Sequence, residues 1–344
     1  MNARKLLTGG GAAGTAVRWG LLTAAVMALL LYVPTPYAAY EPGLAFYTKP
    51  LVRAARPDEP GAGAFMLTTV QMSYANAWKS IRSFWDGDIE LVRKRDLFRG
   101  GSKAEFVERQ TVMMRGSQTD AVEAAYMEAG IPYQIEPYAV VVSDAGAAGG
   151  ALQTGDEIVF FGGRPITSLR ELTLALGRGT VSGQAHVAVI RGGKKKEVSI
   201  KLSAGATADQ QAIALGVRKL TELRRMLPGN AEDEVEIQSG EIGGPSAGLM
   251  FALQTLDELT EGDLTAGLRV AGTGTIDAGG KVGAIGGVAH KVVAAHRAGA
   301  DVFLVPEQNE QEAIAKAAEI GTGMRVIGVG SLREAKRVLT EAGG

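Results

Sequence analysis

Residues 240–259 read GEIGGPSAGLMFALQTLDEL, a glycine-rich turn that leads into a long apolar helix. Ser246 lies at the junction and follows Pro245, whose fixed φ suits the first turn of a helix. Gly243 and Gly244 let the backbone approach a substrate without a Cβ in the way. A serine hydroxyl at this place lies near the positive end of the helix dipole, beside N–H groups that a developing oxyanion requires. The stretch therefore predicts either a nucleophilic serine or a serine that only caps the helix.

A second stretch, residues 272–300, reads GTGTIDAGGKVGAIGGVAHKVVAAHRAGA and predicts a helix from about Gly287 to Gly299. Burial on a helix lowers the pKa of a lysine, and a base useful near neutral pH needs a pKa of roughly 7 or 8 instead of about 10.4. Lys291 is therefore either a general base or a lysine whose ammonium group extends to water. On this helix it shares a face with three apolar residues, Val288, Val292 and Ala295.

The composition excludes several classes of protein. The chain has 344 residues, 46% of them hydrophobic, enough for two or three cores. Lysine and arginine number 36 and aspartate and glutamate 37, so the net charge of −1 offers no field that would attract nucleic acid. The absence of cysteine removes thiol nucleophiles, disulfides and thiolate metal sites.

Metal and nucleotide chemistry are excluded by motif. The sequence has no HExxH, and its three histidines lack the spacing of metal ligands. It has no phosphate-binding loop either, because Gly280 and Lys281 are followed by Val282 where serine or threonine is required. We therefore expect no metal, no nucleotide and no other cofactor.

The N-terminal segment predicts a membrane anchor or a signal peptide. Residues 19–40 carry no charge, and Arg4, Lys5 and Arg18 all precede them. We favour an uncleaved, single-pass anchor, since there is no clear cleavage site after the apolar segment. The basic flank then places the N-terminus in the cytoplasm and everything after about residue 41 outside the cell membrane. Cleavage and secretion is the alternative.

The order of elements predicts a multidomain α+β protein. Residues 1–42 are expected to form the cytoplasmic tip and anchor. Residues 43–131 are expected to form an α/β region that packs on the β-rich region after it. In this α/β region, Asp120 is expected to cap a helix. Residues 132–205 have this β-rich pattern, and 206–344 alternate helices with short strands.

Residues 152–166, LQTGDEIVFFGGRPI, resemble the PDZ-domain pattern of a Leu, a Gly-Asp turn, an Ile-containing strand and a Gly-rich hairpin. The resemblance implies that an extended peptide is added as a strand beside a helix. Pro137 and Tyr138 stand where the carboxylate-binding loop of such domains usually has a glycine. The expected groove is formed by the strand that begins with Ala139, Val140 and Val141 and by the helix from Leu169 to Leu176.

The motifs GGPSAG, TGxI and IGGxxxK, followed by AAHRAG, together resemble the proteolytic domain of the Lon-type serine/lysine proteases. The longer string resembles the subgroup that has a membrane segment and a PDZ domain in place of the ATPase. The resemblance implies that Ser246 is the nucleophile, Lys291 the base and Thr273 a supporting residue near the lysine. Gly243 stands where ATP-dependent members have an acidic residue, so gating by that residue is not implied. Ring-forming relatives make a homo-oligomer an expected state.

The resulting expectation is an ATP-independent serine endopeptidase that cleaves unfolded or flexible protein segments outside the cytoplasmic membrane, with PDZ-assisted capture. Two alternatives stay open. One is a non-catalytic PDZ scaffold or chaperone, and the other is a self-processing peptidase that acts on bonds near the membrane.

Overall fold

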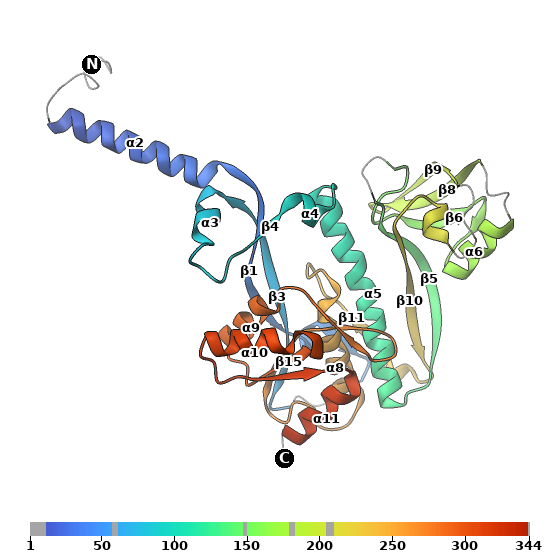
Figure 1. The fold of residues 1–344 in the computed structure, drawn as a ribbon. Coiled ribbons are helices and arrows are strands. Elements are labelled where there is room, and N and C mark those ends of the chain that lie inside the picture. Colours follow the sequence, from blue (N-terminus) through green and yellow to red (C-terminus); the bar gives the residue numbers. More distant parts are fainter. Residues whose placement is uncertain (1–11, 57–60, 147–149, 179–182, 204–209, 343–344) are drawn as a thin grey trace. The chain divides into compact units, whose positions relative to one another are not determined.

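Four neighbouring parallel strands of a six-stranded mixed sheet support the GGPSAG and IGGxxxK segments (Figure 1). Strand β12 (Arg269–Gly272) lies between β3 (Ala64–Asn76) and β15 (Val302–Pro306), and β15 pairs in turn with β16 (Arg325–Val329). All three pairs are parallel. The computed structural model describes residues 12–56, 61–146, 150–178, 183–203 and 210–342.

The strands of this sheet direct alternate side chains into two cores, as expected of parallel strands that are covered on both faces. One core holds Phe65, Leu67 and Val270 and packs against α5 (Lys103–Ala129), α8 (Gly248–Leu259) and α11 (Leu332–Ala342). The other core holds Met66 and Ala271 and packs against α9 (Val288–Arg297) and α10 (Glu310–Glu319). Helices α8 and α9, which carry the GGPSAG and IGGxxxK motifs at their starts, therefore contribute to different cores.

Helix α5 is longer than the sequence suggested. Ser102 and Glu105 form a capping box at its start, and Gly130 ends it in the left-handed conformation. Asp120 was expected to cap this helix, but it lies inside α5, where its carboxylate accepts a hydrogen bond from Arg224 at 2.6 Å. The capping box, 18 positions upstream (120 − 102), is the stronger start signal.

A second sheet has the strand order β10-β5-β6-β8-β9. Its strands are antiparallel, and a core that includes Val140, Leu172 and Val187 lies under them. Short elements complete this region: β7 (Arg164–Pro165), α6 (Leu169–Arg178) and α7 (Gln211–Ala214). The strands are β5 (Tyr133–Asp144), β6 (Glu157–Phe161), β8 (Gln184–Arg191), β9 (Lys194–Lys201) and β10 (Lys219–Pro228).

Two strand pairs flank the loops around the serine. The first pair is β2 (Val52–Ala54) with β11 (Val235–Ile237), and the second is β13 (Thr275–Ile276) with β14 (Val282–Gly283). Short 3₁₀ turns cover Lys49–Leu51, Ala231–Asp233, Pro245–Ala247 and Glu307–Asn309.

The chain divides into two compact units. One contains the described residues up to Glu41 together with Gln71–Leu97, and the other contains Pro42–Val70 and the described residues from Phe98 onward. The first unit contains α2 (Ala12–Tyr32) and α3 (Ala77–Arg82), and in it β1 (Pro34–Tyr47) pairs with β4 (Glu90–Arg93). Helix α4 (Lys94–Phe98) comes next along the chain. Ser246 and its surroundings belong to the second unit.

The predicted α+β class, with an apolar helix near the N-terminus, is confirmed. The predicted domain limits at residues 42, 131 and 205 stay predictions. Residues 64–67 pair with β12, so part of the predicted 43–131 region completes the sheet of the C-terminal region.

Candidate active site

The loop that carries Ser246 is held in place by α5. Gly244 has φ +90° and ψ 149°, a conformation that is essentially restricted to glycine, and its N–H donates to the carbonyl of Gln110 at 2.9 Å. The hydroxyl of Ser117 donates to the carbonyl of Pro245 at 3.0 Å. These contacts fix the backbone on both sides of Gly244 and aim it into the 3₁₀ turn that contains Ser246.

Gly248 allows the start of α8 to approach its neighbours closely. A Cβ on Gly248 would lie 2.6 Å from Oγ of Ser117 and 2.9 Å from Cγ2 of Ile276. Real Cβ atoms do not come so close, so any side chain would push the helix start away from α5 and β13. The absence of a side chain on Gly248 therefore determines how closely the start of α8, and with it Ser246, packs against α5 and β13.

Ser246, Lys291 and Thr273 form a closed group of polar atoms. Nζ of Lys291 lies 2.7 Å from Oγ of Ser246 and 2.8 Å from Oγ1 of Thr273. The Thr273 hydroxyl donates its single proton to the carbonyl of Ser246 at 3.0 Å, so it presents a lone pair to the lysine. The three residues that the sequence singled out are thus brought together.

Burial changes the chemistry of Lys291. Its side chain is 3% exposed, on the face of α9 that also carries Val288 and Val292. Desolvation disfavours the ammonium form and lowers the pKa of Lys291 from 10.5 to about 7. Only hydroxyl groups contact Nζ among the described residues. At neutral pH the amine is therefore neutral in a large fraction of molecules.

Backbone hydrogen bonds tie the serine loop to the end of β12. Thr273 comes directly after β12, and its N–H donates to the carbonyl of Leu304 at 3.0 Å. The N–H of Gly274 donates to the carbonyl of Ser246 at 2.8 Å, and the N–H of Leu249 donates to the carbonyl of Gly274 at 3.1 Å. The parallel sheet thus positions Thr273, and Thr273 with Gly274 positions the serine.

Two residues that hold the loop are not predicted by the sequence. Gln110 and Ser117 lie on α5, and the whole second sheet separates them from Ser246 along the chain. Neither residue belongs to a recognisable motif. Gly116 and Ser117 interrupt an otherwise helix-favouring run, which is the only local sign that small residues are needed there.

The expected peptide groove beside Ala139, Val140 and Val141 is wrong. These residues lie in β5, an interior strand that pairs with β10 along one edge and with β6 at Val140 and Val141 on the other. Both edges of β5 are therefore occupied by the chain itself. Leu176 is 3% exposed in the core, and Leu169 is half-buried, with its N–H donating to Glu222 at 2.7 Å.

Two of the three histidines form hydrogen bonds with residues other than Ser246. His186 of β8 contacts Ser199 at 3.2 Å, and His296 of α9 contacts Thr322 at 3.0 Å. His290 is buried beside Lys291 in sequence. The hydroxyl of Ser246 is bonded to a lysine and not to a histidine.

Two regions of the chain are similar to known protein families. Residues 230–342 match the family described as the Lon protease (S16) C-terminal proteolytic domain, and residues 114–202 match the PDZ domain family. The Lon protease of Clostridium acetobutylicum is 38% identical over 85 residues, which cover 24% of this chain and 11% of that protein. The Lon protease of Clostridioides difficile is 42% identical over 69 residues, or 20% of this chain and 8% of that protein.

A further relative is the Lon protease of Dictyoglomus thermophilum, 37% identical over 84 residues, which cover 24% of this chain and 10% of that protein. The chain thus spans about a tenth of the length of the curated relatives that it matches. The similarity concerns one domain of those proteins and not their whole architecture.

Proposed function

We propose that this chain, which contains a Lon-type (S16) proteolytic domain and a PDZ domain, is a serine endopeptidase with Ser246 as nucleophile and Lys291 as general base. The observation that carries the proposal is the 2.7 Å contact between Oγ of Ser246 and a lysine amine whose pKa burial lowers to about 7. An amine that is neutral near pH 7 accepts a proton from a bound hydroxyl, which an ordinary lysine does not do.

In the first half of the reaction, Nζ of Lys291 takes the hydroxyl proton of Ser246 while Oγ attacks the peptide carbonyl carbon. The tetrahedral oxyanion needs N–H donors. The amides of Gly248 and Leu249 already donate to Pro245 and Gly274, so we assign the oxyanion to the amides of Ser246 and Ala247. The C–N bond then breaks, and the ammonium of Lys291 gives its proton to the leaving amine.

In the second half, the neutral lysine takes a proton from water, and the hydroxide attacks the acyl ester. The C–Oγ bond breaks, and the proton returns from Nζ to Ser246. Thr273 keeps Nζ pointed at the serine throughout, because its own proton is committed to the carbonyl of Ser246. Each step uses only groups of this chain, the substrate and water.

We propose that the peptidase works without nucleotide. The sequence has no phosphate-binding loop that would power unfolding of a substrate. Its substrates are then protein segments that are already flexible or unfolded, since a folded domain rarely exposes an extended peptide bond. Adding ATP and Mg²⁺ is expected to leave the rate of casein cleavage unchanged.

The PDZ domain is proposed to capture substrate along β10. This strand ends its sheet, and no other strand pairs with its outer edge among the residues that the structure describes. The carboxylate of Glu222 on β10 holds the N–H of Leu169, which places the start of α6 beside the strand. An extended peptide that adds to β10 next to α6 uses main-chain hydrogen bonds for affinity. This replaces the groove beside β5.

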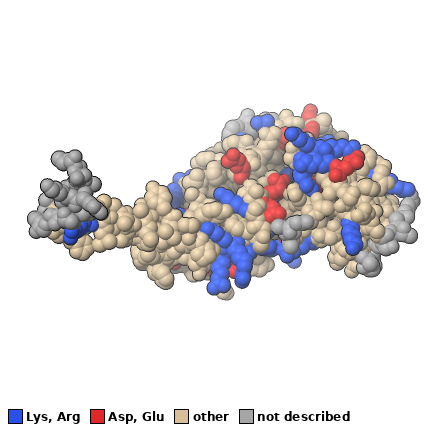
Figure 2. All heavy atoms as spheres, turned by 90° about the horizontal axis from the view of Figure 1, so that it is seen from above, with Lys and Arg blue, Asp and Glu red and all other residues tan. Residues whose placement is uncertain are grey.

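Helix α2 is proposed to anchor the chain in the cell membrane, with the peptidase outside. Gly14–Tyr32 has a mean hydropathy of 1.6 and none of it is buried, and Figure 2 shows mostly uncharged surface on this helix. Its 21 residues give about 30 Å of helix, the thickness of a bilayer core. A signal sequence has the same length and composition, so an intact N-terminus in the membrane fraction of cells is the result that distinguishes an anchor.

Aromatic residues at the end of α2 support the anchor. The side-chain amide of Asn76 donates to the carbonyl of Leu31 at 2.9 Å and so joins the start of α3 to the end of α2. Tryptophan and tyrosine collect at membrane interfaces. The exposed aromatic side chains near this junction in the chain include Tyr32 (82%), Trp78 (44%), Phe84 (88%) and Trp85 (65%).

Hydrolysis of casein by the purified full chain tests the main proposal. Wild-type protein is expected to release peptides, and Ser246→Ala and Lys291→Ala are each expected to abolish release. Replacing His186, His290 or His296 by Gln should leave most of the rate. A Ser246→Ala protein that still cleaves casein, or a wild type that binds peptides without cleaving any, would support the scaffold instead. Loss of the N-terminal segment only in wild type, seen by mass spectrometry, would indicate self-processing.

A further inference from the structure

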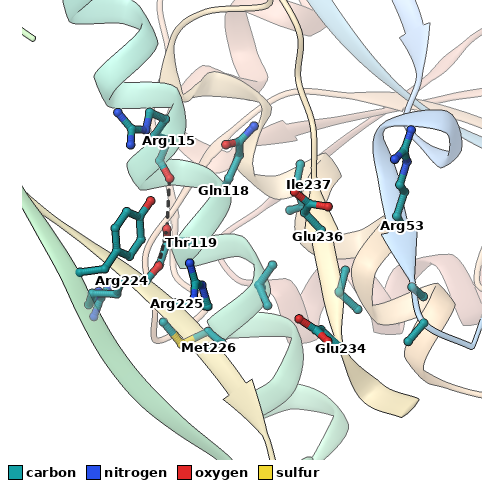
Figure 3. Close-up of a pocket in the computed structure, with 15 residues that line it drawn as sticks. Arg53, Arg115, Gln118, Thr119, Arg224, Arg225, Met226, Glu234, Glu236 and Ile237 are labelled. Atoms are coloured by element: carbon teal, nitrogen blue, oxygen red, sulfur yellow. Dashed lines mark hydrogen bonds between the residues drawn. The ribbon is translucent and has the colours of Figure 1, made fainter. Parts of the chain in front are cut away.

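A pocket of about 740 Å³ lies beside α5, separate from the serine and lysine (Figure 3). Arg115, Gln118 and Thr119 of α5 form one wall. Most of the rest of the lining comes from β10, β11 and β2, and Val122 of α5, Tyr138 of β5 and the loop residues Ala55 and Glu234 complete it. The residues that these strands contribute include Arg224, Arg225, Met226, Glu236, Ile237 and Arg53.

Two strands present main-chain groups at this pocket. The carbonyl of Arg224 accepts a hydrogen bond from the hydroxyl of Thr119 at 3.2 Å, so its polar edge faces α5 and not β5. The residue opposite Arg224 on β5 is Pro137, which has no N–H to offer. β11 pairs with β2 along one edge, and no second strand pairs with it among the described residues. Such edges are suited to an extended polypeptide.

The pocket shares two elements with the surroundings of the serine loop. Ser117 of α5 holds the carbonyl of Pro245, and the next two residues, Gln118 and Thr119, line the pocket. β11 ends at Ile237, nine positions before Ser246 (246 − 237), and the chain between them leads to the nucleophile. β11 is therefore joined to the nucleophile by a short stretch of chain.

β10 joins the pocket to the PDZ domain. Its first half, near Glu222, lies beside the start of α6, and its second half, Arg224 to Met226, lines the pocket. The two halves belong to one strand whose outer edge has no strand partner in the described part of the chain. The register of β10 against β5 shifts between Leu223 and Arg224, so an extended segment that follows this strand bends where the half beside α6 meets the half at the pocket.

The charges of the pocket differ from wall to wall. Arg224 is neutralised by Asp120 at 2.6 Å and Glu123 at 3.2 Å, and Arg115 is neutralised by Glu157 at 2.9 Å. The lining adds the exposed carboxylates of Glu236 on β11 and of Glu234, which directly precedes that strand. Because acids and bases nearly cancel, the pocket has no strong preference for one sign of charge. Main-chain contacts, and not side-chain charge, are then the main source of affinity.

We propose that this pocket binds an extended segment of the polypeptide substrate, between the part held by the PDZ domain and the bond cut at Ser246. The proposal deepens the proposed function and rests on it. It predicts that substrates long enough to reach the pocket are cleaved better than short peptides. It also predicts that Gln118, whose side chain lines the pocket, contacts the substrate directly.

Photo-cross-linking tests this contact without requiring catalysis. Full-length Ser246→Ala protein carrying the photoreactive residue p-benzoylphenylalanine at position 118 is mixed with casein and irradiated. A cross-link to casein is expected at position 118. The matched control carries the same residue at position 127, where Met127 is exposed on α5 and does not line the pocket. Equal cross-linking at positions 118 and 127 would overturn the proposal.

Kinetics give a second, independent measurement. Gln118→Trp fills the pocket and is expected to lower kcat/KM for casein by about tenfold, while kcat/KM for a tetrapeptide changes by less than about twofold. Met127→Trp should change neither. Equal losses on casein and tetrapeptide would contradict the proposal. If the wild-type protein cleaves no substrate, the proposed peptidase function is wrong. The cross-link at position 118 still decides whether the pocket binds polypeptide.

Discussion

The serine and lysine site and the outer edge of β10 satisfy their polar groups in different ways. Lys291 is 3% exposed and contacts two hydroxyls, one of which is bonded to the backbone. On β10, Arg225 is exposed and Glu222 is half-buried. A hydrogen bond broken inside the protein has no replacement, whereas water replaces one broken at the surface. The effect of a substitution should therefore be large at the first region and small at the second.

The largest effect is expected for Lys291→Met, which keeps the apolar stem and removes the amine. Without a base near Oγ of Ser246, kcat/KM for peptide cleavage should fall by at least about a thousandfold. The folded protein should become more stable at the same time, because a lysine whose pKa falls from 10.5 to about 7 opposes folding at neutral pH. At pH 7 the gain is up to about 4 kcal/mol.

The sign of this stability effect is set by proton binding. Between pH 7 and 10.5 the unfolded chain binds more protons at Lys291 than the folded chain, so this residue makes wild-type stability rise with pH in that window. Lys291→Met lacks that rise. Urea unfolding at pH 7 and pH 9 should show the two proteins converging. A variant less stable than wild type at pH 7 would show that the amine does not oppose folding.

The next effect concerns the depth of the serine loop. Gly248→Ala introduces a Cβ that would lie 2.6 Å from Oγ of Ser117, so α8 must shift. We expect a loss of about 1–3 kcal/mol of stability and about a hundredfold loss of kcat, since the shift moves Ser246 away from Lys291. Circular dichroism and peptide hydrolysis measure the two. The matched control is Gly323→Ala, where a Cβ has no atom within 4 Å.

The two regions also differ in how far the sequence predicts them. Ser246, Thr273 and Lys291 could be predicted because each lies in a short motif, and the apolar face of α9 marks Lys291 as unusual. The location of a peptide groove could not be predicted in the same way. The edge of β5 is covered by β10, which begins 75 positions after β5 ends (219 − 144). Alternating side chains identify a strand and not its neighbours, so strand order remained open. The contacts of Gln110 and Ser117 with the serine loop could not be predicted either, because the sequence does not show which parts of the chain α5 packs against.

A moderate effect is expected for Thr273→Val, which keeps the shape and removes the hydroxyl. We expect kcat to fall by about tenfold, because Nζ of Lys291 loses the acceptor that aims it. The wild-type rate should rise with pH around a midpoint near 7, where the lysine becomes neutral. In the variant the ammonium has one acceptor fewer, so the midpoint should move to lower pH.

The pH profile of kcat/KM measures this shift. Thr255→Val is the matched control, because Thr255 is also fully buried, on α8, yet its hydroxyl has no hydrogen-bond partner among the described residues. That variant should keep both the rate and the midpoint of wild type. A Thr273→Val midpoint at higher pH than in wild type would mean that the hydroxyl does not stabilise the ammonium.

The smallest effect is expected on β10. Glu222→Gln leaves an amide oxygen that still accepts from the N–H of Leu169, but it removes the negative charge beside the start of α6. Such a charge is worth about 0.3–1 kcal/mol, so KM for casein should rise by no more than about fivefold, with kcat unchanged. A tetrapeptide, which does not reach this strand, should show no change. If Glu222→Gln instead lowered kcat as much as Thr273→Val, β10 would contribute to the chemical step. The distinction between the buried serine and lysine site, which sets the rate, and β10, which only binds substrate, would then be wrong.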